Sequence, residues 1–463
     1  PSVKRQSGFL PPLIKTISDL GRTFRVPYFW AISEDKDLTL TPVYYFDEKH
    51  SLLGSYRQAF RKGFLKVETG YSGGYKRLEE SGRTNGSRNF IFLDYTGKEK
   101  NLIFSENEIK FKLERVSQKN FLRVNQINTE LFKQDIGNLE NSFKISSYNN
   151  SKRLELRAGI FENMNIDDGS KYTYFLPDGL FSYNLPKIKN FNVNLNTYFQ
   201  GRKFEKNKKQ LKIRNLISAE SPQSINKKIG LSSIYKINLF NKNIYNNNVS
   251  GLKERDNIDN FITIAAENSM PFGKFSRSNF QTLTPKLFLK YTTGSQMDAF
   301  NNNKILEYSD VFSMNRTNDL DLPETGFSLG HGIEYLFNKK NVENRTIFKA
   351  KTGLAQVTRT SKEDNLPNSS SLNNKNSDYA GFLNLNLYGK KTEFYKLDQK
   401  KLSFAKDLGE NFLGVKYNYN LSNDFKKLNR NNLSLEGALN GFYSSFDFDE
   451  KNSHIGSERF ATI

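Results

Sequence analysis

Residues 413–421 read Leu413-Gly414-Val415-Lys416-Tyr417-Asn418-Tyr419-Asn420-Leu421. Every second residue in this stretch is apolar, and the residues between them are polar or glycine. Successive side chains of a β-strand point to opposite faces of the sheet. The alternation therefore predicts a strand with one apolar and one polar face.

The same alternation recurs along most of the chain. It is clear in residues 65–71, 109–114, 153–160, 192–199 and 383–387. Short polar segments between such stretches predict hairpin turns; they are residues 33–37, 148–151 and 422–424. Two longer Asn- and Ser-rich segments without periodicity, residues 241–257 and 365–378, predict long loops.

The composition and charge are unusual for a soluble protein. Hydrophobic residues make up 36% of the 463 residues, but aromatic residues alone make up 14%, so the chain does not have the composition of a disordered protein. The net charge of +20 makes nucleic acid the first binding partner to consider. However, the basic residues alternate with apolar ones over the whole length instead of forming a patch. We therefore expect them to lie on solvated polar faces of the strands, and we expect no nucleic-acid partner. A polyanionic lipid is also compatible with this charge.

Catalytic and metal-binding signals are nearly absent from the sequence. It has no cysteine, and its three histidines, His50, His331 and His454, show no metal-ligand spacing. No nucleophile or phosphate-binding motif occurs. We therefore expect no enzyme activity, no catalytic residues, no metal and no cofactor.

The alternating strands favour a membrane barrel over a soluble β protein. No apolar run is long enough for a transmembrane helix, and no linkers divide the chain into several sandwiches. The polar faces carry Lys, Arg, Glu and Asn together, which suits a water-filled lumen. Aromatic clusters at predicted strand ends, at residues 28–30 and 44–46, suit the girdles of such barrels. The predicted fold is thus all-β, a large antiparallel transmembrane β-barrel.

The N-terminal hundred residues contain the segment 1–12, PSVKRQSGFLPP, followed by residues 26–32, VPYFWAI, and 37–42, DLTLTP. These segments resemble the LptD family of lipopolysaccharide-assembly proteins. The first is similar to the family's connector from a periplasmic jelly-roll domain to the barrel, and the other two resemble its first barrel hairpin. Residues 56–58, 63–65 and 283–286 also match the family's pattern. Residues 312–316, FSMNR, with Asp321 and Gly326, resemble a family loop, although Asn318 and Asp319 stand where that loop usually has Gly before Asp.

The resemblance implies a domain organisation and partners. Residues 1–20 would be the connector and residues 21–463 the barrel, with about 18–22 strands of a roughly 26-strand barrel present. The chain begins at Pro1 without Met and lacks a signal peptide; we expect the jelly-roll domain and several C-terminal strands to lie outside it. The implied location is the outer membrane of a Gram-negative cell. The implied partners are lipopolysaccharide, outer-membrane lipids, an LptE-like plug lipoprotein and an LptA-type periplasmic bridge.

Pro27 and Pro42 fall within the first predicted hairpin. Proline has no N–H and cannot complete a strand ladder, although an ordinary edge proline is an alternative interpretation. The resemblance implies that Pro27, Pro42 and the neighbouring Val26 lie at a weak seam that opens as a lateral gate for lipopolysaccharide. The predicted function is a translocon that inserts lipopolysaccharide into the outer leaflet.

Other functions remain open from the sequence. Another large outer-membrane barrel, such as a porin or a TonB-dependent receptor, is the main alternative. A soluble, basic, β-rich binding protein is a further one, and an outer-membrane lipid-modifying enzyme is the weakest. Folding in water without detergent would identify the soluble class.

Overall fold

The structure is a computed structural model of the 463-residue chain. It describes all residues except 1–4, 18–19, 75–85, 134–136, 167, 206, 250–256, 301–303, 318, 320, 399–402, 440–441, 453–456 and 463. Its 26 strands belong to one antiparallel sheet, so the predicted all-β, antiparallel fold class is confirmed. Among the described residues, no helix is both long enough and apolar enough to cross a membrane.

The chain divides into two units. The first unit comprises Pro1–Leu185, Asn194–Leu216 and Asn241–Asp259, and the second comprises Pro186–Val193, Ile217–Phe240 and Asn260–Ile463. The strands up to β11 lie within the first unit, and those from β18 onward lie within the second. Between them, β12, β13, β14, β16 and β17 contribute residues to both units, and β15 lies in the second. All the strands of both units nevertheless belong to the one sheet, and the sequence predicted no internal boundary after residue 20.

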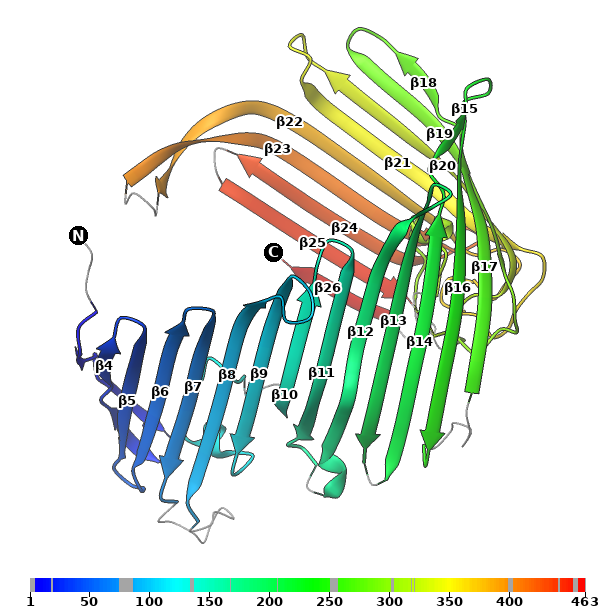
Figure 1. The fold of residues 1–463 in the computed structure, drawn as a ribbon. Helices are drawn as coiled ribbons and strands as arrows, with labels where there is room; N and C mark the ends of the chain where they lie inside the picture. Colours follow the sequence, from blue (N-terminus) through cyan, green and yellow to red (C-terminus); the bar gives the residue numbers. More distant parts are fainter. Residues whose placement is uncertain are drawn as a thin grey trace. The chain divides into compact units, whose positions relative to one another are not determined.

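The strands and helices of the N-terminal part include one short α-helix, α1. They are β1 (Gly8–Phe9), β2 (Leu13–Ile17), β3 (Gly21–Arg25), β4 (Tyr28–Ser33), β5 (Lys36–Tyr45), β6 (Ser51–Phe60), β7 (Gly63–Ser72), β8 (Arg88–Lys100), β9 (Glu106–Val116), α1 (Phe121–Val124), β10 (Asn138–Tyr148), β11 (Lys152–Asn163) and the 3-10 helix η1 (Gly169–Lys171). From β4 to β11, each strand pairs antiparallel with the next along the chain, as the neighbouring blue to green arrows in Figure 1 show.

The middle part of the chain contains long strands and two short ones. They are β12 (Tyr172–Ile188), β13 (Phe191–Phe204), β14 (Lys208–Glu220), β15 (Ser224–Asn226), β16 (Leu231–Asn247), β17 (Asn257–Ser269) and β18 (Phe272–Phe275). The C-terminal part consists of β19 (Asn279–Thr292), η2 (Asp310–Phe312), β20 (Gly326–Lys340), β21 (Thr346–Arg359), β22 (Tyr379–Asp398), β23 (Ser403–Leu421), β24 (Leu428–Leu439), β25 (Phe442–Asn452) and β26 (Ser457–Thr462).

Two predictions of irregular structure need correction. The connector expected over residues 1–20 contains two short strands, β1 and β2. The loop expected over residues 241–257 is strand as far as Asn247 and again at Asn257, and its residues 250–256 lie outside the described residues. Here asparagines bond across to β14 through their side chains: Asn215 donates to Asn241 Oδ1 at 3.1 Å, and Gln210 donates to Asn246 Oδ1 at 2.9 Å. The loop predicted at 365–378, by contrast, is confirmed, apart from one isolated bridge at Asn376.

The two faces of the strands differ in an unexpected way for a water-soluble protein. On β19, Leu287, Leu289 and Tyr291 are 40–47% exposed, whereas Lys290 between them is 1% exposed and Thr292 is 2% exposed. The apolar face is therefore the exposed one, and the polar face is covered. In water such an exposed apolar face is unfavourable, whereas it is the expected outer surface of a strand in lipid.

Chain segments between the strands cover the polar face at several places. In the first unit, residues 117–132, with α1, place Phe121, Leu122 and Ile127 against Phe90 and Phe92 of β8. In the second unit, the segments 304–325 and 360–378 do the same over β21 and β22; the apolar cluster there comprises Leu306, Tyr308, Val311, Leu366 and Leu372 from the segments, and Ala355, Val357, Ala380 and Phe382 from the strands. These clusters are the local cores of the protein.

Candidate functional site

The three residues predicted for the gate lie together at a break in the first edge of the sheet. β3 and β4 are consecutive in the chain and both pair with β5: Tyr28 is opposite Leu40, and Arg25 is opposite Val43. Val26 and Pro27 form the junction between the two short strands, and the amide of Val26 bonds to Pro42 of β5. The structure thus brings Val26, Pro27 and Pro42 together.

Each proline removes one hydrogen bond from this edge. The amide of Val26 donates to the carbonyl of Pro42 at 3.3 Å, but Pro42 has no N–H to return the bond to Val26. On the other side, the amide of Leu10 donates to the carbonyl of Pro27 at 2.9 Å, and Pro27 likewise returns none. In a regular antiparallel sheet, both residues of such a pair donate and accept. Two adjoining pairs are therefore each held by half of their normal bonds.

The strand outside β4 adds little further pairing. β1 pairs with β4 through Gly8 and Phe9 only, with the Leu10 bond continuing the ladder. The ring of Phe9 packs edge-on against Tyr28 at a centroid distance of 5.1 Å. Because ladder bonds and cross-strand pairs are what stabilise a sheet edge, this short edge is held by fewer bonds than a regular edge would have.

Side-chain contacts hold the same edge in position. Asp37, at the start of β5, is almost completely buried and accepts from Arg57 Nε at 2.9 Å and Nη2 at 3.2 Å. Arg5, in the segment before β1, donates to the same carboxylate at 3.0 Å. A guanidinium that makes two parallel bonds to a carboxylate is geometrically well defined. Asp37 therefore links the segment before β1 to β5 and β6.

The hairpin of β2 and β3 is tied to the segment 117–132, about a hundred residues away in the sequence. Arg25 Nη2 donates to the carbonyl oxygens of Asn125 and Gln126 at 2.9 and 3.1 Å. Lys15 donates to Gln126 Oε1 at 2.9 Å. A small apolar cluster of Ile17, Leu20, Val43 and Tyr45, with Val124 against it, accompanies these bonds. Sequence reasoning missed this support because nothing in the periodicity of 117–132 relates it to residues 13–25.

A second feature that the sequence did not reveal is a buried charge cluster in the second unit. Glu324 accepts from Lys290 at 2.5 Å and from Arg316 at 2.9 Å, and it also pairs with Arg359; the Lys290, Arg316 and Glu324 side chains are 0% exposed. Burial alone would raise the pKa of Glu324, but the neighbouring Arg316, Lys290 and Arg359 lower it far below its usual value. The cluster fastens the segment 304–325 to β19 and β21.

The backbone of the strand is adapted to this segment. A Cβ atom at Gly330 of β20 would collide with the carbonyl oxygen of Val311, which lies directly over it. Arg316 additionally donates to that carbonyl at 3.1 Å and to Ser328 Oγ at 2.8 Å. The FSMNR motif at 312–316 thus supplies, through its arginine, the anchor of the whole segment.

The residues that could take part in catalysis stay dispersed. His331 lies on β20, where its Nε2 is 3.2 Å from Thr358 Oγ1, and the ring of His50 packs against that of Tyr44 at an interplanar angle of 51°. His454 lies outside the described residues. Within the described part of the chain, no group of three or more His, Asp or Glu side chains is arranged to hold a metal ion.

Comparisons with known proteins identify no family for this chain. No family model matches the sequence, and no curated protein matches it. Among solved structures, the outer membrane protein OprD from Pseudomonas aeruginosa is 13% identical with a TM-score of 0.26, over 95% of this chain and 92% of that one. OpdK from the same organism is 9% identical with a TM-score of 0.25, over 92% of this chain and 99% of that one. OpdK with vanillate is 10% identical with a TM-score of 0.25, over 95% and 97%. Similarities at this level carry no conclusion about the function of this chain.

Proposed function

We propose that this chain is an integral outer-membrane β-barrel that inserts lipopolysaccharide into the outer leaflet by opening the edge formed by β1, β3, β4 and β5. The observation that carries the proposal is the pair of half-bonded positions, Val26 with Pro42 and Leu10 with Pro27. The location in the membrane is supported by the exposed apolar face of the strands, as on β19.

The proposed transport involves no covalent chemistry. An amphiphile that enters a membrane from the side needs an opening whose backbone groups separate at low cost, because unpaired N–H and C=O groups are unfavourable in lipid. Prolines remove the N–H groups in advance, so fewer bonds break when the edge opens. The acyl chains would then pass directly into the bilayer while the sugars stay with the polar face. A plug lipoprotein and a periplasmic bridge are partners that this proposal requires.

The proposal is tested by photocrosslinking in living cells. A photoreactive residue replaces Val26 in the full-length protein, newly made lipopolysaccharide is pulse-labelled, and adducts are followed over time. We expect an adduct at Val26 that appears early and then decays as the labelled molecules move on. The matched control is Ile264 on β17, a β-branched residue that is 50% exposed. At Ile264 any adduct should reflect resident lipid and should not decay.

The second candidate is a porin-like barrel without lateral transport. It is favoured by the polar face of β9 to β11, where Lys112, Lys144 and Arg157 alternate with acidic partners as in a water-filled lumen. A purified protein that conducts small solutes across a bilayer, together with no early adduct at Val26 in cells, would favour the porin and refute the transport proposal.

A further inference from the structure

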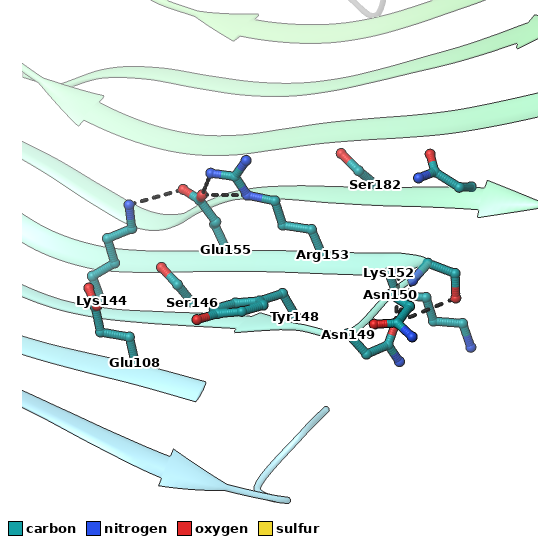
Figure 2. A pocket seen from close by; sticks show the side chains of 12 residues that line it. Glu108, Lys144, Ser146, Tyr148, Asn149, Asn150, Lys152, Arg153, Glu155 and Ser182 are labelled. Carbon is teal, nitrogen blue, oxygen red and sulfur yellow. Dashed lines mark hydrogen bonds and ion pairs between the residues drawn. The ribbon is translucent and has the colours of Figure 1, made fainter. Parts of the chain in front are cut away.

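Two neighbouring pockets lie on the polar face of the first unit, between the start of β7 and β12. Their volumes are about 630 and 660 Å³, and they share the side chains of Glu108 and Tyr148 as a common wall. Figure 2 shows the first of them, formed over the hairpin of β10 and β11 and reaching Ser182 on β12. We call the two together the polar trough. Each volume is within the range of pockets that bind small organic ligands.

Two aromatic rings are exposed in the polar trough. Tyr148 is 45% exposed and Phe64 is 47% exposed. Phe64 lies two residues before the buried Lys66, and Tyr148 lies two residues after Ser146, so both rings are on the polar face of their strands. An aromatic ring on a wet face offers a flat surface on which the C–H side of a sugar ring can pack, while the sugar hydroxyls bond to groups around it.

Groups that bond to hydroxyls surround Tyr148. In the first pocket they are the side chains of Ser146, Asn149, Asn150, Ser151, Ser182 and Asn184. Hydroxyl and amide groups both donate and accept, which matches the mixed donors and acceptors of a saccharide. A lining of this kind is too polar for an acyl chain, so a lipid tail is not the ligand that the first pocket fits.

The charge of the polar trough favours an anionic ligand. Seven Lys or Arg side chains and four Glu side chains line the two pockets. Among the basic ones, Arg61, Lys98, Lys100 and Lys152 have no carboxylate partner among the described residues (Lys152 lies 5.0 Å from the ring centre of Tyr183). Basic side chains without acidic partners are suited to phosphate, which accepts several charge-assisted hydrogen bonds.

Other basic groups are already oriented toward the pocket. Lys144 Nζ is 3.0 Å from Glu155 Oε2, and Arg153 Nε is 2.9 Å from Glu155 Oε1. Figure 2 shows both side chains directed at this one carboxylate, with Tyr148 below them. A single Glu155 thus fixes two cations and leaves each with further donors free for a ligand. Fixed donors cost less entropy on binding than mobile ones.

From this combination we infer that the polar trough binds a phosphorylated oligosaccharide, with sugar rings on Tyr148 and Phe64 and phosphate on the basic side chains around Arg153. The inference goes beyond the transport proposal, since it requires neither the gate nor lateral insertion and would hold equally for a porin-like barrel.

The test measures binding to the full-length protein in detergent by isothermal titration calorimetry. Lactose 1-phosphate, lactose and inorganic phosphate are the soluble probes. We expect lactose 1-phosphate to bind at least tenfold more tightly than either of the others. Tyr148→Ala and Arg153→Gln should each weaken it by about tenfold, as expected for the loss of one ring platform or one charge-assisted bond.

Matched variants control for general effects of the substitutions. Lys119→Gln removes one positive charge from an exposed position outside the polar trough, and Tyr71→Ala removes a ring that is 55% exposed on the apolar face. Both should leave binding unchanged. Circular dichroism and electrophoretic mobility of unheated samples check that every variant is folded.

The results that would overturn the inference are specific. If lactose binds as tightly as lactose 1-phosphate, the inference that the ligand carries a phosphate is wrong. If inorganic phosphate binds as tightly as lactose 1-phosphate, the inference that the ligand is a saccharide is wrong. A loss of binding in the control variants as large as that in the trough variants also overturns it. A second arm repeats the titration with the same phosphosaccharide linked to a lipid in mixed micelles. The same dependence on Tyr148 and Arg153 supports a lipid-linked source, whereas binding of the soluble probe alone supports a free sugar phosphate. If lactose 1-phosphate binds to the polar trough as expected but no early adduct forms at Val26, the transport proposal is refuted and the inference about the polar trough stands.

Discussion

Replacing both prolines of the first edge should close it more firmly. Pro27→Ala and Pro42→Ala each restore an N–H, so the backbone at position 27 could donate to the carbonyl of Leu10, and the backbone at position 42 could donate to that of Val26. A hydrogen bond contributes about 1 kcal/mol net, so two restored bonds stabilise the closed edge by about 2 kcal/mol. That corresponds to an open population about 30-fold smaller. If opening limits transport, lipopolysaccharide delivery should slow by a factor of the same order.

The assay follows newly synthesised lipopolysaccharide to the cell surface after a pulse label in cells that express only the variant. Pro285→Ala is the matched control, because Pro285 of β19 also accepts from a neighbouring amide, that of Met270 at 3.2 Å, without returning a bond. This control restores the same kind of bond far along the chain from Val26. Unchanged delivery in a double variant that is folded and inserted would refute the reasoning. Equal slowing by Pro285→Ala would also refute it, since it would show a general effect of strand prolines.

Three further predictions concern the side chains that hold the covering segments and the edge. Glu324→Gln leaves three buried cations without a carboxylate and should destabilise the segment 304–325 by about 3–5 kcal/mol. The measurement is the rate of proteolysis in this segment, which should rise. The control Glu343→Gln, at an exposed ion pair, should leave that rate unchanged. The pKa of Glu324 is lower in the folded protein than its ordinary value of 4.5, so its contribution to stability is present above that pH and is lost as the pH falls below it; wild type should lose resistance to urea on acidification more steeply than Glu324→Gln. Asp37→Asn weakens the bonds to Arg5 and Arg57 and should make the segment before β1 more sensitive to protease, while Pro27→Ala should not.

The alternation of apolar and polar residues was sufficient to predict the strands. Residues 413–421 lie in β23 and residues 383–387 lie in β22, and in both stretches the apolar residues occupy one face of the strand. On that face the structure pairs Leu383 with Tyr417 and Leu385 with Val415. This information is local, because a strand has the same period wherever its partner lies. The turn residues at 149–151 and 422–424 were equally readable, since their chemistry also acts over a few residues.

The covering segments could not be predicted for the opposite reason. The bonds that place 117–132 reach residues 15, 25 and 68, and those of 304–325 reach residues 290 and 359. Within either segment the apolar residues have no sustained period, because α1 and η2 are only four and three residues long and the remaining residues are irregular chain packed against a strand face. Pro27, Pro42 and Val26 were proposed as gate residues because the resemblance places them at a seam, and because a proline cannot donate a ladder bond in any strand. The polar trough is formed by three hairpins, β6–β7, β8–β9 and β10–β11, together with β12, and no local sequence pattern shows that they form a common pocket.

The first edge combines weak backbone pairing with firm side-chain attachment, and the two have different consequences. If the edge only needed to be stable, full ladder pairing would be simpler, and the two prolines would only weaken it by removing hydrogen bonds. If it only needed to be mobile, the links from Asp37 to Arg5 and Arg57, and from Arg25 to Asn125, would oppose that mobility. Together they allow the ladder at Val26 and Leu10 to separate while the segments on both sides stay attached. Proline substitutions should therefore change the rate of opening without detaching the N-terminal segment, and Asp37→Asn should detach that segment without restoring the ladder. A hinge of this kind predicts that the two effects add independently in the triple variant, and strong coupling between them would show that pairing and attachment act as one unit.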